Sequence, residues 1–251
     1  MAADQYFADH MSDIRRPVMR IYQWKPWCIS LGYHQSPSCL NLDECRKDGI
    51  DAVRRQTGGR AVYHAEEITY SIILPADHAF AGSVSKTYQC LSEGLAAGLR
   101  MLGIPASFQK RTINIRDHYA AKISASCFSA AALHEIVIRG KKLVGSAQRR
   151  MPGAVLQHGS ILIGPAHSGL FRYLNGLDAE EQAGMTREVT EKTTCLRAEN
   201  EKLDYRTVGQ ALKQGMAETL GIQFKTKMLD SDENRHIRSL KKQFVIFENT
   251  G

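Results

Sequence analysis

Residues 83–102 constrain the fold most, because their apolar positions recur at steps of three and four and predict one long amphipathic helix. Gly103 and Pro105 end this helix. Its apolar positions are Val84, Tyr88, Leu91, Leu95, Leu99 and Leu102. The chain on either side shows the shorter alternation of strands, so the fold combines a sheet with packed helices.

Strand-like segments precede and follow this helix. Those ahead of it are 18–24, 27–33, 50–55, 61–63 and 68–74, and those after it are 135–138, 142–148 and 155–163. We expect the first two segments to pair with each other. Residues 2–11 predict a short helix, 42–47 a helical turn, and 207–220 and 231–244 two further helices. The order predicts an α+β class with helices on one side of the sheet, a catalytic core at residues 1–175 and a C-terminal helical segment at 176–251 packed on it.

The composition is that of an ordinary globular chain, with 251 residues, 43% hydrophobic and 24% charged. No apolar run approaches the roughly 20 residues of a membrane helix, and the N-terminus lacks the pattern of a signal peptide. We therefore expect a cytoplasmic protein that does not act at a membrane. The six cysteines form no CxxC pair, which disfavours disulfides and structural zinc, and no metal site is expected.

The net charge of +7 and the pI of about 9.1 indicate a basic surface. Such a surface can attract nucleic acid, anionic lipid or an acidic protein, and an ordinary solvated surface is an equally good interpretation. Charge alone does not choose among these partners.

A glycine-arginine run follows the predicted strand at 50–55. Glycines permit positive φ and close approach of a ligand to the backbone, and successive amides can form a nest that binds anions. The run predicts a site for an anionic or strongly polar ligand, and a Gly-Gly hairpin turn is the alternative. Its candidate binding residues are Arg54, Arg55, Thr57, Gly58, Gly59, Arg60 and, in the next strand, His64.

The segment 140–148 places a lysine beside small residues. In a regular strand Lys142 and Ser146 share one face, while Gly145 and Ala147 share the other. The small side chains suit a ligand lying against the strand, and Lys142 could extend its ammonium into a pocket as an oxyanion partner or proton carrier. A surface lysine beside a turn is the alternative.

Two further groups carry reactive side chains. His158 and Ser160 lie on one side of a predicted strand, but no G-x-S-x-G elbow accompanies them, so a hydrogen-bonded structural histidine is the alternative to a hydrolase pair. Cys127 lies among small residues in a loop-like stretch, where a nearby lysine could lower its pKa and make it a nucleophile. A small buried side chain is the alternative, as for the other cysteines.

Together these motifs resemble the biotin/lipoate protein ligase superfamily over residues 26–163. The matching segments are 26–34, 54–64, 67–71, 140–148 with Lys142 at the catalytic-lysine position, and 157–160. Within the superfamily the chain most resembles the LipM-type octanoyltransferases, because Cys127-Phe128 lies ahead of His134-Glu135-Ile136 and the loop reads Gly-Gly-Arg. The resemblance implies a mixed sheet like the core of class II aminoacyl-tRNA and biotin synthetases.

The resemblance also implies a reaction. Octanoyl would pass from the phosphopantetheine arm of acyl carrier protein to Cys127, and then to a lysine of a lipoyl-carrier domain, in the glycine cleavage H protein or a dehydrogenase E2. Lys142 would favour the thiolate, stabilise the oxyanion with nearby backbone amides and, once neutral, accept a proton from the attacking lysine. His64 and His158 would position groups, and Gly145, Ser146 and Ala147 would line the substrate site. No cofactor besides the donor substrate is expected.

The positive charge would then steer acidic carrier proteins to the enzyme. A basic stretch near Cys127 is a candidate docking face, or an ordinary solvated one; it comprises Arg100, Lys110, Arg111, Arg116 and Lys122.

Three other functions remain open. An ATP-dependent lipoate ligase would share the arginine-glycine loop and Lys142 but would not need Cys127. An amidotransferase that moves octanoyl between carrier domains would also use a cysteine. A nucleic-acid-binding module on a synthetase-like fold has only the basic pI in its favour, and the sequence lacks a clustered basic-aromatic patch.

Overall fold

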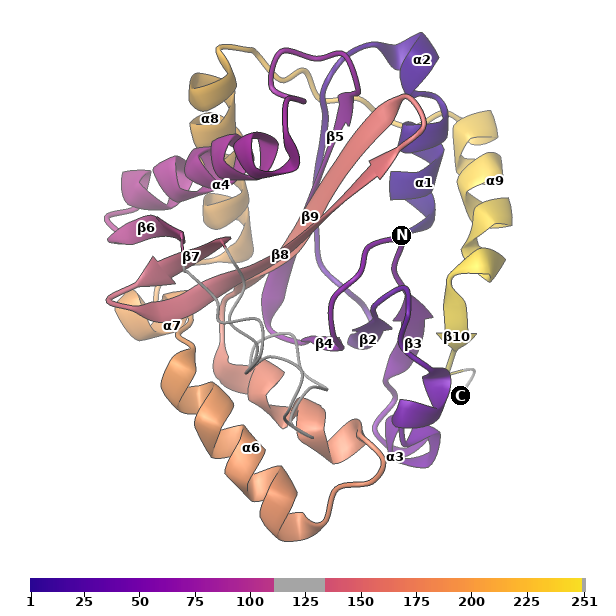
Figure 1. Ribbon diagram of the computed structural model, residues 1–251, viewed down its shortest axis with the longest axis vertical. Coiled ribbons are helices and arrows are strands. Elements are labelled where there is room, and N and C mark those ends of the chain that lie inside the picture. The colour runs from indigo at the N-terminus through magenta and orange to yellow at the C-terminus, as the bar shows by residue number, and fades with distance from the viewer. Residues whose placement is uncertain (111–133, 250–251) are drawn as a thin grey trace.

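The computed structural model describes residues 1–110 and 134–249, which form two sheets with flanking helices (Figure 1). The larger sheet is antiparallel, with strand order β1-β5-β9-β8-β7-β6. Its strands are β1 (Val18–Tyr22), β5 (Glu67–Pro75), β6 (Ala106–Lys110), β7 (His134–Ile138), β8 (Lys141–Met151) and β9 (Ala154–Leu162).

The smaller sheet has the order β10-β3-β2-β4 and contains one parallel pair, β2 with β3. Its strands are β2 (Cys28–Leu31), β3 (Asp51–Arg54), β4 (Val62–His64) and β10 (Val245–Phe247). The expected pairing of segment 18–24 with 27–33 is therefore wrong, since β1 pairs with β5 while β2 belongs to the other sheet. The predicted α+β class is confirmed, although the strands divide between two sheets.

Helices cover both faces of the larger sheet. The α-helices are α1 (Ala2–Asp9), α2 (Met11–Ile14), α3 (Leu42–Lys47), α4 (Val84–Met101), α6 (Ala179–Lys192), α7 (Leu196–Glu199), α8 (Tyr205–Leu220) and α9 (Ser231–Leu240). Short 3-10 helices are η1 (Pro37–Cys39), η2 (Pro165–Tyr173) and η3 (Lys241–Gln243). The prediction that helices lie on one side is wrong, because α1 packs on Ile73 and Leu156 while α4 and α8 belong to the main core on the other face. Among the described residues no helix is long and apolar enough to span a membrane.

The long helix α4 follows the predicted period, with Leu91, Leu95 and Leu99 fully buried. Ser83 caps its N-terminus, where its side chain accepts a hydrogen bond from the backbone N–H of Lys86. Figure 1 shows α4 crossing α8. At the crossing a Cβ on Gly98 would lie 2.4 Å from the backbone oxygen of Ala211. The two backbones therefore meet at a distance that excludes any side chain at this position.

We expect Gly98→Ala to lower the free energy of unfolding by about 1–3 kcal/mol, because the added methyl group must separate two packed helices. Urea denaturation measures the change. The matched control is Gly184→Ala in α6, where a Cβ would meet no atom within 4 Å, so that stability should stay the same or rise by up to about 1 kcal/mol through helix propensity. Equal stability of the two variants would contradict the close crossing.

Candidate active site

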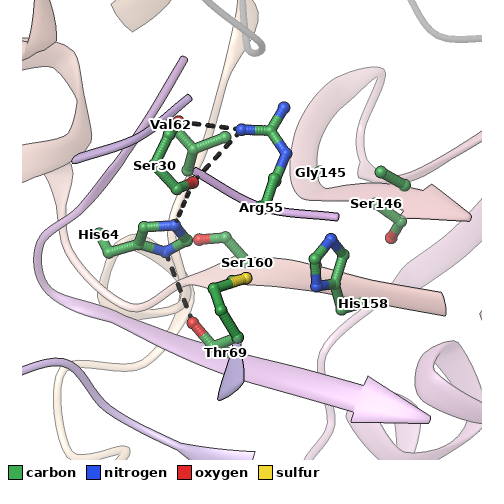
Figure 2. Close-up of a pocket in the computed structure, with 12 residues that line it drawn as sticks. Ser30, Arg55, Val62, His64, Thr69, Gly145, Ser146, His158 and Ser160 are labelled. Atoms are coloured by element: carbon green, nitrogen blue, oxygen red, sulfur yellow. Dashed lines mark hydrogen bonds between the residues drawn. The ribbon is translucent and has the colours of Figure 1, made fainter. Parts of the chain in front are cut away.

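A pocket lies where the two sheets meet (Figure 2). The smaller sheet contributes residues from β2 and β4, and the larger sheet contributes residues from β5, β8 and β9. The cavity has a volume of ≈ 30 Å³, more than the roughly 10–15 Å³ that a cavity needs to hold one water molecule. Its lining consists of Met1, Ser30, Arg55, Val62, His64, Thr69, Gly145, Ser146, Ala147, His158, Gly159 and Ser160.

The arginine-glycine loop is no hairpin turn. It joins β3 to β4, which are separated in the smaller sheet by β2, so the loop crosses the end of β2. Gly59 takes a φ of +97°, and a Cβ on Gly32 would lie 1.9 Å from the Gly59 carbonyl oxygen. Two glycines are therefore required where the loop passes over the end of β2.

Arg55 is buried, with 4% of its surface exposed, and its guanidinium binds the backbone of this loop. Its Nη1 donates to the Ser30 carbonyl oxygen at 2.9 Å, and its Nη2 donates to the carbonyl oxygens of Gly58 at 3.1 Å and Arg60 at 2.6 Å. The neighbouring Arg54 donates through Nη1 to the carbonyl oxygens of Gly32, Tyr33 and Gln35. Both guanidinium groups thus bind backbone carbonyls, while Arg55 also lines the pocket.

His64 sits in a chain of hydrogen bonds that begins on β2 and ends on β5. Its Nε2 lies 2.7 Å from Ser30 Oγ, and its Nδ1 lies 3.2 Å from Glu67 Oε1. The ring stacks on Trp24 with a centroid separation of 4.8 Å. All three members of the chain are buried, so a hydroxyl, an imidazole and a carboxylate are held together away from water.

His158 forms a second such group on β9. Its Nε2 lies 2.7 Å from Thr57 Oγ1 in the loop, and its Nδ1 lies 4.0 Å from Oδ2 of Asp4 on α1. Asp4 is fully buried and accepts a hydrogen bond from Arg20. Burial lowers the pKa of His158 to about 3, so the imidazole is neutral at physiological pH. Thr57 and His158 join the loop to the larger sheet.

Small residues keep the β8 and β9 side of the pocket open. A Cβ on Gly159 would lie 2.4 Å from the Gly145 carbonyl oxygen and 2.7 Å from Tyr70 Cε1. The Ser146 hydroxyl accepts a hydrogen bond from the Tyr70 hydroxyl at 2.6 Å. Burial raises the pKa of Tyr70 to about 12, which keeps this phenol protonated as a donor.

Lys142 is buried on β8 but is not among the residues that line the pocket. The β7–β8 register pairs Val137 with Lys142 and Ile136 with Val144, so β8 carries one extra residue between these pairs. This bulge interrupts the regular alternation that the sequence predicts from Lys142 to Ser146. The backbone oxygen of Lys142 accepts a hydrogen bond from the Thr194 N–H at 2.9 Å, which ties this part of β8 to the chain after α6.

The structure brings together part of the predicted site. Six predicted residues line the pocket: Arg55, His64, Gly145, Ser146, Ala147 and His158. Thr57 contacts His158. Arg54 at the end of β3 and Gly58, Gly59 and Arg60 in the loop do not line the cavity. Cys127 lies outside the described residues, as do Arg111, Arg116 and Lys122 of the expected docking face.

Sequence reasoning missed the polar neighbours of the two histidines as site residues. They are Ser30, Glu67, Thr69 and Asp4. Ser30 and Glu67 stand inside segments that resemble the superfamily, and that position was the one available signal. Within residues 1–110 and 134–249 no group of three or more His, Cys, Asp or Glu side chains could hold a metal ion.

The described cysteines are poor candidates for a nucleophile. They are Cys28, Cys39, Cys45, Cys90 and Cys195, all free thiols, and none lines the pocket. Burial raises the pKa of Cys28, Cys39 and Cys90 above the usual value, and that of Cys45 to about 11. A thiol with a raised pKa forms less of the thiolate that attacks carbonyl carbon.

The two-sheet fold with a pocket at the sheet junction has counterparts of known structure. Solved structures share this fold: a bi-partite lipoate protein ligase from Thermoplasma acidophilum matches with a TM-score of 0.74 at 22% identity, over 96% of this chain and 88% of that one. A lipoate-protein ligase A bound with ATP matches with a TM-score of 0.72 at 22% identity, over the same shares. At this level of identity the likeness concerns the fold alone.

The chain belongs to the lipoyl protein ligase A/B catalytic domain family, which matches residues 1–217. It is 36% identical over 248 residues to the octanoyltransferase LipM of Lysinibacillus sphaericus, covering 97% of this chain and 90% of that protein. It is 34% identical over 248 residues to the octanoyltransferase LipM of Clostridioides difficile, with the same coverage. The predicted family and its LipM group are confirmed.

The buried histidines predict a pH-dependent stability. Burial lowers the pKa of His158 to about 3 and that of His167 to about 4, from an ordinary 6.5. Between pH 6.5 and 4.5 the unfolded chain therefore binds protons that the folded chain does not. Each histidine should reduce the free energy of unfolding by up to about 1.4 kcal/mol per pH unit as the pH falls.

Urea denaturation between pH 7 and 4.5 tests this dependence. His158→Asn and His167→Asn should each show a flatter decline than the wild type, whereas substitution of the exposed His34 by Asn should retain the wild-type slope. If all four proteins lose stability in parallel, the buried histidines are not responsible.

Proposed function

We propose that this chain moves an octanoyl group from the phosphopantetheine thioester of acyl carrier protein to a lysine of a lipoyl-carrier domain, through a thioester on Cys127. The observation that carries the proposal is the full-length similarity to octanoyltransferases named LipM, which covers 97% of the chain at 36% identity. The chain is thus an octanoyltransferase of lipoate biosynthesis. Its carrier partners and its nucleophile are the proposed part.

The choice of Cys127 is supported by elimination among the sulfurs. None of the other cysteines, all within the described residues, lines the pocket, and burial raises the pKa of Cys28, Cys39, Cys45 and Cys90. Cys127 belongs to the stretch that connects β6 to β7. Its two ends, Lys110 and His134, are paired across these neighbouring strands, and β7 in turn pairs with β8, which lines the pocket.

The first half-reaction is an exchange of thioesters. The Cys127 thiolate attacks the octanoyl carbonyl carbon, a new C–S bond forms, and the pantetheine sulfur leaves and takes up a proton. Since one thioester replaces another, the step is close to thermoneutral and needs no ATP. We assign to Lys142 the stabilisation of the thiolate and of the tetrahedral oxyanion, together with backbone amides near Gly58, Gly59 and Gly145.

The second half-reaction forms an amide. The carrier lysine, as a free amine, attacks the acyl-enzyme carbonyl; a C–N bond forms, the C–S bond breaks, and the Cys127 sulfur departs. The amine must lose a proton during this step, and Lys142 in its neutral form is one candidate to accept it. Conversion of a thioester to an amide is downhill and drives the cycle.

The partners fit the charge of the chain. Acyl carrier proteins and lipoyl domains are typically acidic, so a net charge of +7 favours encounter with both. The lipoyl-carrier domain of the glycine cleavage H protein and that of a dehydrogenase E2 are the proposed acceptors. The free thiols among the described cysteines suit a reducing compartment, and we place the reaction in the cytoplasm.

Intact mass spectrometry after incubation with octanoyl-acyl carrier protein tests the nucleophile. We expect the wild type to gain one octanoyl group that neutral hydroxylamine removes, and Cys127→Ala to gain none and to lose transfer to the carrier domain. The matched control is Cys39→Ala, which removes a half-buried thiol outside the pocket and should acylate normally.

A parallel assay with lipoate and ATP separates the rival ligase activity. Transfer from the thioester donor that persists in Cys127→Ala would refute covalent catalysis, and lipoylation that requires ATP and proceeds in Cys127→Ala would favour the ligase. An octanoylated carrier domain that is a better donor than acyl carrier protein would favour the amidotransferase.

A further inference from the structure

The chain of hydrogen bonds through His64 ends in a group that can only donate on each side, and one side of the ring faces the Glu67 carboxylate, which can only accept. At one end the Arg55 guanidinium donates through Nη1 to Ser30 Oγ at 3.3 Å. At the other end the Trp24 indole donates through Nε1 to Thr69 Oγ1 at 2.8 Å. Neither group can accept a hydrogen bond, so each occupies one lone pair of the hydroxyl that it contacts.

The Glu67 carboxylate determines the tautomer of the neutral His64 ring. A carboxylate only accepts hydrogen bonds, so the ring proton is on Nδ1, and Nε2 accepts from Ser30 Oγ at 2.7 Å. Nδ1 then donates to Glu67 Oε1 at 3.2 Å, and Thr69 donates to the same oxygen at 2.6 Å. The chain thus runs from Ser30 through His64 to Glu67, with a basic ring nitrogen directed at the hydroxyl. Figure 2 shows Ser30, His64 and Thr69 of this chain.

Glu67 is suited to support a positive charge on the ring. It is buried with 4% of its surface exposed, and its Oε2 has no hydrogen-bond partner within residues 1–110 and 134–249. Its negative charge is therefore only partly compensated by the two donors at Oε1. If His64 takes up a proton at Nε2, the imidazolium meets this carboxylate in a site of low dielectric, where the attraction is strong.

The hydroxyl end of the chain opens into the pocket. Ser30, His64 and Thr69 line the cavity, whereas Glu67 does not. Ser30 Oγ already uses its proton for His64 and one lone pair for Arg55, which leaves one lone pair for a further donor. The cavity volume of ≈ 30 Å³ accommodates a group the size of water, such as an amine nitrogen.

We propose that Ser30 and His64, supported by Glu67, accept the proton that the attacking lysine loses in the second half-reaction. The amine N–H donates to Ser30 Oγ while the Ser30 proton moves to His64 Nε2, the C–N bond forms, and the C–S bond of the acyl-enzyme breaks. The proton then returns from His64 through Ser30 to the departing sulfur or to water. This inference rests on the proposed function. It assigns the base to the Ser30–His64–Glu67 hydrogen-bond chain and leaves to Lys142 the stabilisation of the thiolate and the oxyanion.

The two half-reactions place different demands on the Ser30–His64–Glu67 hydrogen-bond chain. Thioester exchange starts from a thiolate and removes no proton from an amine, so it does not require the Ser30–His64 pair. Aminolysis requires it, and loss of a general base costs about 10²–10⁴-fold in rate. A purely structural role for these residues would slow both halves together.

The experiment measures both halves in His64→Gln, Ser30→Ala and Glu67→Gln. Acylation by octanoyl-acyl carrier protein is followed by intact mass, and the isolated acyl-enzyme is then mixed with a lipoyl-carrier domain in a single turnover. We expect acylation at close to the wild-type rate in all three variants. Discharge to the carrier lysine should slow by about 100-fold or more in His64→Gln, and also in the other two variants.

Hydroxylamine is a strong nucleophile that cleaves thioesters in free solution at neutral pH without an enzyme base. It should discharge the acyl-enzyme of His64→Gln as fast as that of the wild type. The matched control is Ser92→Ala, which removes a buried hydroxyl in α4 that does not line the pocket and should discharge to the carrier lysine at the wild-type rate.

The outcomes separate this inference from the proposed function. Normal acylation with slow discharge to lysine alone supports the proton-accepting chain. Discharge of His64→Gln to lysine at the wild-type rate overturns it, as does an equal loss in both half-reactions. If the wild type itself forms no acyl-enzyme, the thioester route fails, and this inference is overturned with it.

Discussion

The site depends on the buried guanidinium of Arg55. Its hydrogen bonds to the carbonyl oxygens of Ser30, Gly58 and Arg60 hold the β3–β4 loop against β2. A buried charge without partners would be costly, and carbonyl oxygens together with the Ser30 hydroxyl satisfy its donors. Because the same group lines the pocket, the interaction that closes the loop also orients the first hydroxyl of the His64 chain.

The junction of the two sheets explains why hydroxyl, imidazole and carboxylate groups can meet there. His64 ends β4 in the smaller sheet and Glu67 begins β5 in the larger one, with two residues between them. Glu66 takes a φ of +48° in this connection, a conformation uncommon for residues other than glycine. The change of sheet thus brings together two side chains that a continuous strand would separate. Contacts of the Glu66 side chain with Arg197 and with the Ala166 N–H offset the cost of the unusual Glu66 backbone conformation.

Local periodicity predicted the positions of helices and strands well, but it predicted poorly which strands pair with each other. The steps of three and four at residues 83–102 mark α4, and the alternation at 142–148 and 155–163 marks β8 and β9. The strand that pairs with β1 is β5, which is buried along its whole length between two layers of helices. A Gly-Gly break has the same local pattern in a hairpin and in a crossover, so only the strand order of the smaller sheet distinguishes them.

The predicted site was incomplete for the same physical reason. A motif identifies glycines and arginines that act on the backbone of their own loop. Ser30 and Glu67 lie in two separate sheets, and only the folded structure joins them through hydrogen bonds to His64. The bulge at Leu143 likewise comes from the β7–β8 register, and it changes how Lys142 is placed relative to Gly145. The pocket therefore combines a loop encoded locally with hydrogen-bonded chains that only the tertiary fold assembles. In this pocket burial keeps His158 neutral beside Thr57, while His64 lies with Nδ1 3.2 Å from the Glu67 carboxylate.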